Sequence, residues 1–348
     1  MKKELKSIYI EIISRCNEKC IYCYNNEIID KTITMPLEKI KSIIDQSVLL
    51  GVHSIAISGG EPLLHPDIME ILSYTAEKNI PVTLITNCTL IDAERACLLA
   101  DKKINIQVTV DSGIEKVHDT SRGKGTFNRQ KEALKKLKAE NFCGTFNLRC
   151  NIWKGNCDKG NMESVLDFAR RFEITDVTFA LAHPTSIFHN VIDTESQINK
   201  LQIYMKELRD QNKDLKIDFQ EEQTEWGCPL TTNEKTTNLD CGFRIAPDGK
   251  VFPCQNFEDE EFVIGNLMTE TLQEIVDGEK FTDLLTLLNL RLKYIPACLN
   301  CVCRSICRAG CPAKAYRETK NIFSVSGDCG KRKKEYRDIL NEALHFNI

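Results

Sequence analysis

The stretch SIYIEIISRCNEKCIYC, residues 7–23, places a strand-like apolar run directly before three cysteines. Residues Ser7–Ile13 are rich in isoleucine and predict a buried β-strand. Cys16, Cys20 and Cys23 follow on one short loop, in the spacing Cys-x3-Cys-x2-Cys. Three thiolates on such a loop can hold three irons of a cubane cluster and leave the fourth iron open to a ligand. A zinc site with a remote fourth ligand is the alternative, although zinc motifs favour paired cysteines or a nearby histidine.

Cysteine is abundant, with 17 residues in a chain of 348. Secreted disulfide scaffolds are small, and an odd number of cysteines fits complete pairing poorly. The N-terminus also lacks the apolar core and cleavage site of a signal peptide. The net charge of −4 argues against nucleic-acid binding, and no apolar run is long enough to span a membrane. We therefore expect a cytoplasmic protein, with neither nucleic-acid nor membrane partners, whose cysteines bind metal.

The first two-thirds of the chain alternates apolar β-rich runs with amphipathic helical patterns. The further strands expected are His53–Ile57, Pro81–Thr86, Ile104–Val110, Gly144–Ile152 and Asp176–Leu181. The helices expected between them are Pro36–Leu50, Asp67–Lys78, Asp92–Ala100, Phe127–Glu140 and Met162–Phe172. Six repeats are too few for a closed eightfold barrel, so we predict an α/β fold with a partial (β/α)6 TIM barrel. Such barrels carry their functional loops at the C-terminal ends of the strands. A helix at Thr194–Gln211 and a strand at Leu215–Phe219 follow.

The sequence changes in character after about Glu225. Helical periodicity weakens, while glycine, proline and cysteine become frequent, which is typical of a segment held by its metals. We expect a hairpin around Pro247–Gly249 and a closing amphipathic helix at Lys331–His345. The chain is therefore divided into a barrel domain, residues 1–220, and a C-terminal cysteine-rich domain, residues 221–348.

The cysteine spacing, with Tyr22 before the third cysteine, resembles the signature of the radical S-adenosylmethionine (SAM) superfamily. Members of this family bind SAM to a [4Fe–4S] cluster. A second motif, Gly59-Gly60-Glu61-Pro62, follows the second expected strand. In the family, the matching GGEP segment binds the amino group of SAM, whereas GGEP alone could be a tight turn. The resemblance extends from about Ile8 to Cys329, and it makes the three N-terminal cysteines the expected ligands of the SAM-binding cluster.

Polar side chains end the third and fourth expected strands. Thr86 and Asn87 end one, and Thr109 and Asp111 end the other. The resemblance implies that they contact the ribose or carboxylate of SAM, at the end of the barrel where functional side chains lie. Capping of the following helices is the alternative. Arg122 is a further candidate for the SAM carboxylate.

A C-terminal set of cysteines resembles the SPASM extension, in which radical SAM enzymes carry two auxiliary [4Fe–4S] clusters. By this resemblance, the first cluster is held by Cys228, Cys241, Cys254 and Cys311. The second is held by Cys298, Cys301, Cys307 and Cys329. A zinc ribbon is the alternative for this region.

Several cysteines receive no ligand role. Cys303 lies inside the C-terminal set but off its spacing. Cys97, Cys143 and Cys150 fall in expected helices or strands and are interpreted as small buried hydrophobes. Cys88, beside the end of the third strand, could approach the active site.

The family resemblance implies SAM and three [4Fe–4S] clusters as cofactors. It also implies reductive cleavage of SAM to a 5′-deoxyadenosyl radical, which abstracts hydrogen from a peptide or protein. We expect maturation of a ribosomally synthesised peptide by a C–S or C–C crosslink or a related oxidation. The electron donor expected is a low-potential flavodoxin or ferredoxin. Because the first strand begins within ten residues of the start, the substrate would be recruited by the barrel mouth, the auxiliary domain or a separate leader-binding protein.

A sulfatase-maturing enzyme is a second hypothesis for the function. Such an enzyme would oxidise Cys or Ser to formylglycine, and in that family an Asp follows the cysteine at the end of the hairpin as general base. Gln255 stands there in this chain, and an amide cannot accept a proton near neutral pH. Asp259 could substitute for it. An enzyme of cofactor biosynthesis is a third hypothesis, and a non-enzymatic zinc or iron–sulfur structural module is a fourth.

Overall fold

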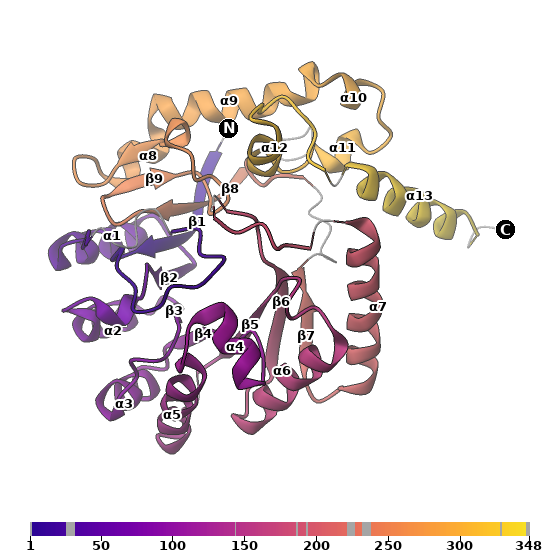
Figure 1. Cartoon of the computed structure of the whole chain (residues 1–348). Coiled ribbons are helices and arrows are strands. Elements are labelled where there is room, and N and C mark those ends of the chain that lie inside the picture. Colours follow the sequence, from indigo (N-terminus) through magenta and orange to yellow (C-terminus); the bar gives the residue numbers. More distant parts are fainter. Residues whose placement is uncertain are drawn as a thin grey trace.

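A single mixed sheet forms the centre of the molecule (Figure 1). The computed structural model describes residues 2–25, 32–142, 144–185, 187–192, 194–220, 227–231, 238–327 and 329–345. The sheet has ten strands in the order β10-β9-β8-β1-β2-β3-β4-β5-β6-β7. Its parallel series comprises β1 (Lys2–Glu11), β2 (Ser54–Ser58), β3 (Val82–Thr86), β4 (Asn105–Thr109), β5 (Phe146–Ile152), β6 (Asp176–Leu181) and β7 (Lys216–Phe219). These strands pair in chain order, as βα units require.

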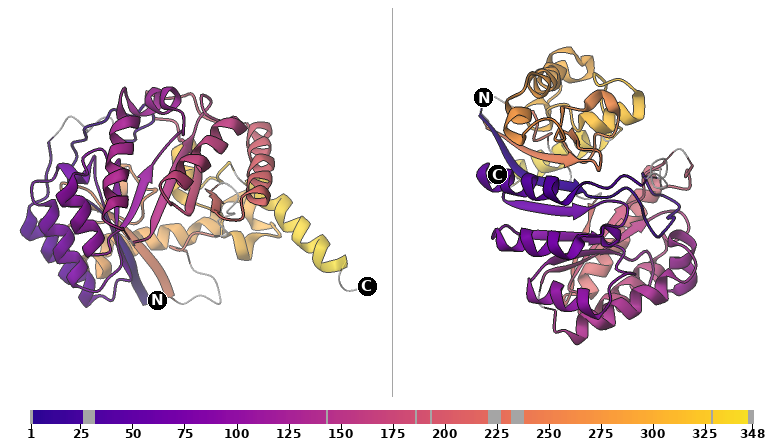
Figure 2. Two further views of the ribbon diagram at one scale, coloured as in Figure 1. Left: turned by 90° about the horizontal axis from the view of Figure 1, so that it is seen from below. Right: turned by 90° about the vertical axis from the view of Figure 1, so that its left-hand side faces the viewer.

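Helices cover the convex side of this curved sheet (Figures 1 and 2). They are α1 (Leu37–Leu49), α2 (Ile68–Glu77), α3 (Ala93–Asp101), α5 (Thr126–Ala139), α6 (Lys159–Arg171) and α7 (Glu195–Gln211). Successive side chains of β1 point to opposite faces of the sheet. Ile8 and Ile10 are buried in the main hydrophobic core, together with Ile40 of α1. The sheet does not close on itself, because β7 and β10 are its two edges. The predicted partial barrel is therefore confirmed, and β7 continues it beyond six strands.

The C-terminal part joins the barrel through β8 (Asn238–Ile245). This strand pairs in parallel with β1, from Lys2 to Ile10, although more than 200 residues separate the two in sequence. β8 then forms the predicted hairpin with β9 (Lys250–Phe252), and β10 (Gly265–Asn266) follows. Gly249 has a φ of +86°, which favours glycine at this turn. The hairpin flanked by Cys241 and Cys254 is thus an extension of the barrel sheet, while the division at residue 220 stays a prediction.

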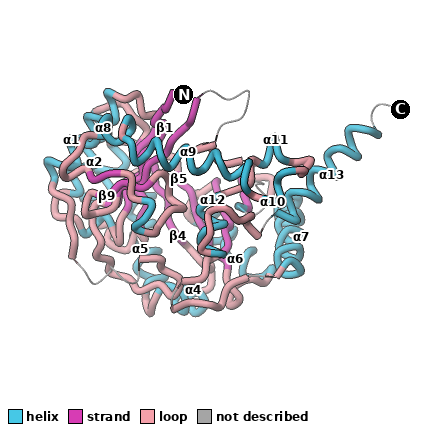
Figure 3. The backbone as a smooth tube through the Cα atoms, turned by 90° about the horizontal axis from the view of Figure 1, so that it is seen from above, coloured by secondary structure: helices cyan, strands magenta, loops and turns pink. Residues whose placement is uncertain are grey.

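The expectation of weak helical structure after residue 225 was wrong. The C-terminal part contains α8 (Leu272–Asp277), α9 (Glu279–Tyr294), α10 (Pro296–Leu299), α11 (Arg304–Cys307), α12 (Pro312–Thr319) and α13 (Cys329–His345). Along α9, Leu284 and Leu288 form a buried stripe that continues into Arg291. The spacing of these residues is helical, so the signal for this helix was present in the sequence. The short charged helix α4 (Glu115–Arg122) was also missed. The predicted closing helix, α13, projects from the body of the molecule (Figures 1 and 3).

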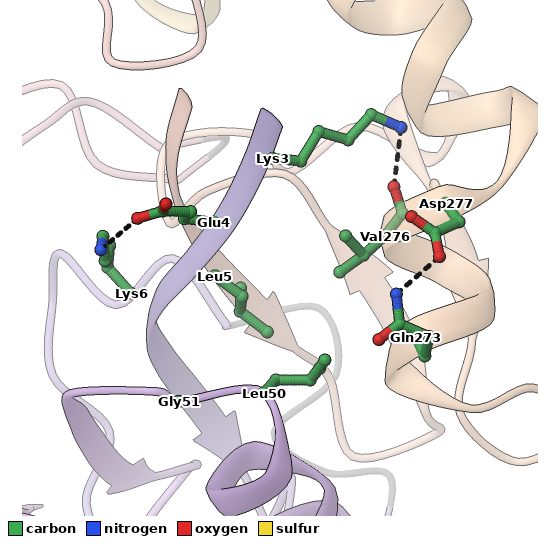
Figure 4. Close-up of a pocket in the computed structure, with 9 residues that line it drawn as sticks. All are labelled: Lys3, Glu4, Leu5, Lys6, Leu50, Gly51, Gln273, Val276 and Asp277. Atoms are coloured by element: carbon green, nitrogen blue, oxygen red, sulfur yellow. Dashed lines mark hydrogen bonds and ion pairs between the residues drawn. The ribbon is translucent and has the colours of Figure 1, made fainter. Parts of the chain in front are cut away.

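One cavity, of about 660 Å³, lies between the N-terminal end of β1, the turn at Leu50 and Gly51, and α8 (Figure 4). Lys3 crosses beside it and donates a hydrogen bond from Nζ to the carbonyl of Val276, at 2.7 Å. The cysteine loop follows the other end of β1, roughly 25 Å away at 3.3 Å per residue. This cavity is therefore separate from the candidate site. No helix within the described part of the chain is long and apolar enough to cross a membrane.

Candidate active site and cysteine clusters

The three N-terminal cysteines lie on the loop that leaves β1, and all three are half-buried. The backbone N–H of Cys23 donates to the carbonyl of Cys20 at 3.2 Å, and that of Glu18 donates to Cys16 Sγ at 3.4 Å. Burial raises the pKa of Cys16 to about 12 and raises the pKa values of Cys20 and Cys23. The neighbouring thiols of Cys16 and Cys23 raise that of Cys20 further. Thiolates at these positions therefore need a positively charged partner, which iron supplies.

The GGEP segment packs directly beneath this loop. The backbone N–H of Gly60 donates to the carbonyl of Ile13 at 2.7 Å, and that of Glu61 donates to Arg15 at 2.9 Å. A Cβ atom at Gly60 would lie 2.3 Å from the carbonyl oxygen of Ser14, which no side chain tolerates. The sequence explained the glycines by close approach to a ligand. The structure gives them a second reason, the contact between two loop backbones.

Glu61 connects the ends of β2 and β3. Its side chain is 1% exposed. One carboxylate oxygen accepts hydrogen bonds from Leu63 N–H (3.0 Å) and Thr86 Oγ1 (2.7 Å), and the other accepts from Asn87 N–H (2.8 Å). Burial raises the pKa of Glu61 to about 7. Asn87 also donates from Nδ2 to Asn17 Oδ1, at 2.9 Å, in the cysteine loop. The structure thus brings together the predicted residues Gly59 to Pro62, Thr86 and Asn87.

Asp111 follows the end of β4 and holds the cysteine loop, while its predicted contact with SAM stays a prediction. It is fully buried, and its Oδ2 accepts hydrogen bonds from Tyr22 Oη and from Ser121 Oγ (2.6 Å). Its Oδ1 accepts from the backbone N–H of Asn151 at 3.2 Å. Both carboxylate oxygens therefore have protein partners, and Asp111 anchors the tyrosine of the cysteine loop. The carbonyl of Thr109 accepts from Gln130 Nε2 at 3.0 Å.

The helix-capping alternative for these strand ends is wrong. The helix after Asn87 has Asp92 as its N-cap, and the helix after Asp111 has Ile114. Asn87 and Asp111 instead form contacts across the barrel mouth, to the cysteine loop and to β5.

A buried ion pair joins the cysteine loop to α4. Arg122 Nη2 lies 2.9 Å from Glu18 Oε2, and their side chains are 10% and 2% exposed. Glu18 also accepts from Cys20 Sγ, at 3.7 Å. Sequence reasoning singled out Arg122 but missed Glu18. A carboxylate between two cysteines of the motif was the available signal.

The C-terminal cysteines form two groups. Burial raises the pKa of Cys228, and the nearby thiols of Cys311 and Cys254 raise it further. Burial also raises the pKa of Cys298, as do its neighbours, Cys307, Cys329 and Cys301. These groupings contain seven of the eight cysteines predicted as ligands, in the interleaved order predicted, and the ligand sets stay a prediction. Cys241 is buried in β8, where it pairs with Leu5.

Arg291, on α9, lies between the two groups and was missed by sequence reasoning. Its side chain is fully buried, and its guanidinium donates hydrogen bonds to four carbonyls, those of Ile322 (2.6 Å), Gly310 (3.0 Å), Ala309 (3.1 Å) and Ser324 (2.9 Å). Burial lowers its pKa, whereas thiols of both groups act in the opposite direction. Within the described part of the chain it forms no ion pair. A buried cation needs a compensating negative charge, and anionic iron–sulfur clusters on both sides would supply it.

The donor chemistry of these sites fits iron–sulfur clusters. Each group consists of neighbouring cysteine thiols, and thiolates are the usual ligands of [4Fe–4S] clusters. Anionic clusters would also compensate the buried charge of Arg291.

The remaining cysteines differ in how far they are buried. Cys150 is buried, as predicted, but Cys97 is exposed on α3, so the interpretation of Cys97 as a buried hydrophobe was wrong. Cys143 lies outside the described residues. Cys88 is fully buried beside Glu61, which raises its pKa in addition to the effect of burial.

The parallel partial barrel, with its cysteine loop after the first strand and GGEP after the second, defines a class of SAM-dependent iron–sulfur proteins. Residues 10–159 match the family model of the radical SAM superfamily. Residues 238–302 match the SPASM model, described as an iron–sulfur cluster-binding domain. The chain therefore carries a radical SAM domain and a SPASM domain.

Relatives support this assignment. The chain is 28% identical over 279 residues to the antilisterial bacteriocin subtilosin biosynthesis protein AlbA of Bacillus subtilis (strain 168), covering 77% of this chain and 58% of AlbA. Streptococcus suis SuiB bound to S-adenosylmethionine superposes with a TM-score of 0.75 at 19% identity, covering 93% of this chain and 76% of SuiB. Native anSMEcpe with bound AdoMet gives 0.73 at 20% identity, covering 98% of this chain and all of that one. Both are also known with peptides bound, SuiB with its precursor peptide SuiA. At these identities, the two structures show the fold.

Proposed function

We propose that this chain abstracts hydrogen from a peptide or protein substrate and so matures a ribosomally synthesised peptide, through a C–S or C–C crosslink or a related oxidation. The observation that carries the proposal is the presence of a three-cysteine loop after β1 together with two further cysteine groups in the C-terminal part, which β8 joins to the barrel sheet. The similarity to AlbA over 77% of the chain, and the peptide complexes of SuiB and anSMEcpe, support a peptide substrate.

Cys16, Cys20 and Cys23 would hold the SAM-binding cluster, and Gly59 to Pro62, Thr86 and Asn87 would hold SAM beside it. Together these groups would supply a 5′-deoxyadenosyl radical, from one-electron reductive cleavage of SAM, for hydrogen abstraction. The chain's own residues position these groups. Glu61 presents a buried carboxylate to the amino group of SAM, and Asp111 fixes Tyr22 in the cysteine loop.

The two C-terminal groups would hold auxiliary clusters, which makes three [4Fe–4S] clusters in all. The ligands proposed are Cys228, Cys241, Cys254 and Cys311 for the first, and Cys298, Cys301, Cys307 and Cys329 for the second. Four thiolates per cluster leave no open iron, which favours electron transfer over substrate binding. The electron donor proposed is a low-potential flavodoxin or ferredoxin. A separate protein is proposed to bind the leader of the substrate.

The surroundings of Gln255 favour crosslinking over formylglycine formation. Gln255 is exposed and has no basic function. Asp259, the carboxylate that could replace it as a base, is ion-paired to Lys320 at 2.9 Å. Glu11, on the concave side of β1, is buried and held by Arg244 at 3.1 Å. Each of these nearby carboxylates therefore has a cationic partner.

The test is anaerobic reconstitution of the full chain, followed by incubation with SAM, a reductant and a precursor peptide encoded beside its gene. We expect about twelve irons per chain, release of 5′-deoxyadenosine and a peptide that has lost two hydrogens. Replacing Cys16, Cys20 and Cys23 with alanine should abolish release. Zinc in place of iron, with no SAM cleavage, would overturn the enzymatic proposal. Conversion of a sulfatase peptide to formylglycine, with no change to the precursor, would overturn the crosslinking one.

A further inference from the structure

Cys303 does not behave as a cysteine buried for packing alone. It lies in the stretch CLNCVCRSIC, residues 298–307, and its side chain is 1% exposed. It belongs to none of the hydrophobic clusters formed by the residues that the structure describes. Instead it lines a small cavity whose other walls include the four thiols proposed for the second auxiliary cluster, those of Cys298, Cys301, Cys307 and Cys329. Five thiols therefore surround a site where a cubane needs four.

The neighbour of Cys303 that matters most is Cys301. Cys301 lies two residues before Cys303 and lines the same cavity, as does Cys307. Between Cys301 and Cys303, Val302 is 66% exposed and faces solvent. The backbone holds this arrangement, because the N–H of Arg304 donates to Cys301 O at 3.1 Å and that of Cys307 donates to Cys303 O at 2.7 Å. Cys301 and Cys303 thus turn their thiols to the same side of the cavity.

The cavity wall also carries positive charge. Arg304, Arg332 and Lys333 line it. Cations there would offset the negative charge of a thiolate-ligated cluster. A thiol that is buried among other thiols and cations has the surroundings of a ligand.

We propose that Cys303 is a fifth ligand-competent thiol of the second auxiliary site, able to bind the iron that Cys301 otherwise holds. This rests on the proposed function, which places a cluster there. The exchange transfers no electrons. The Cys303 thiol gives up its proton and its sulfur binds the iron, while the released Cys301 sulfur takes up a proton. The cluster then keeps four thiolates when either cysteine is lost, for example by oxidation.

The test compares C301A, C303A, the double variant C301A/C303A and, as the matched control, C307A. All are made in the full chain carrying C16A/C20A/C23A and then reconstituted, because the N-terminal cluster has an iron without a cysteine and would itself give the signal that is read. Because three thiolates can retain a cubane with one labile iron, iron content alone is insufficient. EPR after mild oxidation reports that labile iron as a [3Fe–4S] signal. We expect both single variants to hold about eight irons, like the C16A/C20A/C23A parent, without the signal. The double variant and C307A should show it.

A [3Fe–4S] signal in C301A alone, equal to that of the double variant, would overturn the proposal and make Cys303 a buried structural thiol. A signal in C303A but not in C301A would overturn the exchange and make Cys303 the fixed ligand. Absence of iron from the unaltered chain at all three sites would instead overturn the proposed function.

Discussion

The two cysteine regions of this molecule are held in different ways. The loop with Cys16, Cys20 and Cys23 rests on ordinary protein contacts, namely the backbone of Gly60 and Glu61, the buried Glu18 pair and the anchored Tyr22. Residues 295–327 have fewer such supports. Their helices α10 and α11 span four residues each, and their own hydrophobic cluster is built on three buried residues, Ile295, Cys298 and Ala309.

The C-terminal region also contains backbone strain. Arg308 and Ala309 have φ values of +47° and +64°, in the left-handed region that non-glycine residues avoid at a cost of about 1–2 kcal/mol each. The carbonyls of Ala309 and Gly310 accept hydrogen bonds from Arg291. From this difference we expect the barrel to form the N-terminal site before any cofactor binds. We expect the C-terminal sites to depend on bound metal and on one buried cation.

Removal of iron should give the largest difference in behaviour between the two cysteine regions. Anaerobic chelation is expected to open residues 295–327, whose contacts depend on bound thiolates, while residues 7–20 stay ordered. Hydrogen–deuterium exchange should rise by roughly a hundredfold or more in the first segment and by less than about tenfold in the second. An equal rise in both segments would contradict the comparison.

The substitution Arg291→Met should have the next largest effect. It leaves four buried carbonyls without their donor and removes the charge between the two auxiliary sites, a loss on the order of 4 kcal/mol. Iron content should fall from about twelve to about four per chain, with the EPR signal of the N-terminal cluster retained. Arg337→Met, on the exposed face of α13, is the control and should keep all clusters. Loss of the N-terminal cluster as well would show that the two regions are not independent.

The substitution Gly60→Ala tests the packing of the N-terminal region. The added Cβ would lie 2.3 Å from Ser14 O and 2.4 Å from Arg15 O, so the GGEP and cysteine loops must separate. We expect SAM affinity to fall by about a hundredfold, equivalent to roughly 3 kcal/mol, measured by anaerobic equilibrium dialysis. Gly330→Ala, where a Cβ meets nothing within 4 Å, is the matched control. Unchanged SAM affinity in Gly60→Ala would contradict the packing argument.

The smallest effect expected is a pH dependence of SAM binding. The pKa of Glu61 is raised from 4.5 to about 7 by burial, so its carboxyl becomes protonated as the pH falls below 7. The ammonium group of SAM favours the ionised form, so binding must then release a proton. Affinity should decrease toward low pH, approaching about tenfold per unit. Calorimetry in buffers of different ionisation enthalpy should detect the proton, and Glu61→Gln should abolish the slope. A flat profile in the unaltered chain would argue that Glu61 does not face the amino group.

Much of the barrel could be predicted from sequence, because the strands and helices between residues 7 and 219 show local periodicity. Helix α9 was missed, although Leu284, Leu288 and Arg291 follow one another at helical spacing and were the available signal. The hydrogen-bond partners of the Glu61 and Asp111 carboxylates could not be predicted, because they come from other strands and helices.

The sequence by itself determined the class of chemistry. The spacing of Cys16, Cys20 and Cys23 is fixed by consecutive backbone geometry, so it is readable without a fold. Only the tertiary structure decided that β8 lies beside β1, that Arg291 lies between the two C-terminal thiol groups, and that Cys303 faces the same cavity as Cys301. These arrangements depend on which buried faces pack together, and no local pattern along the chain specifies that choice.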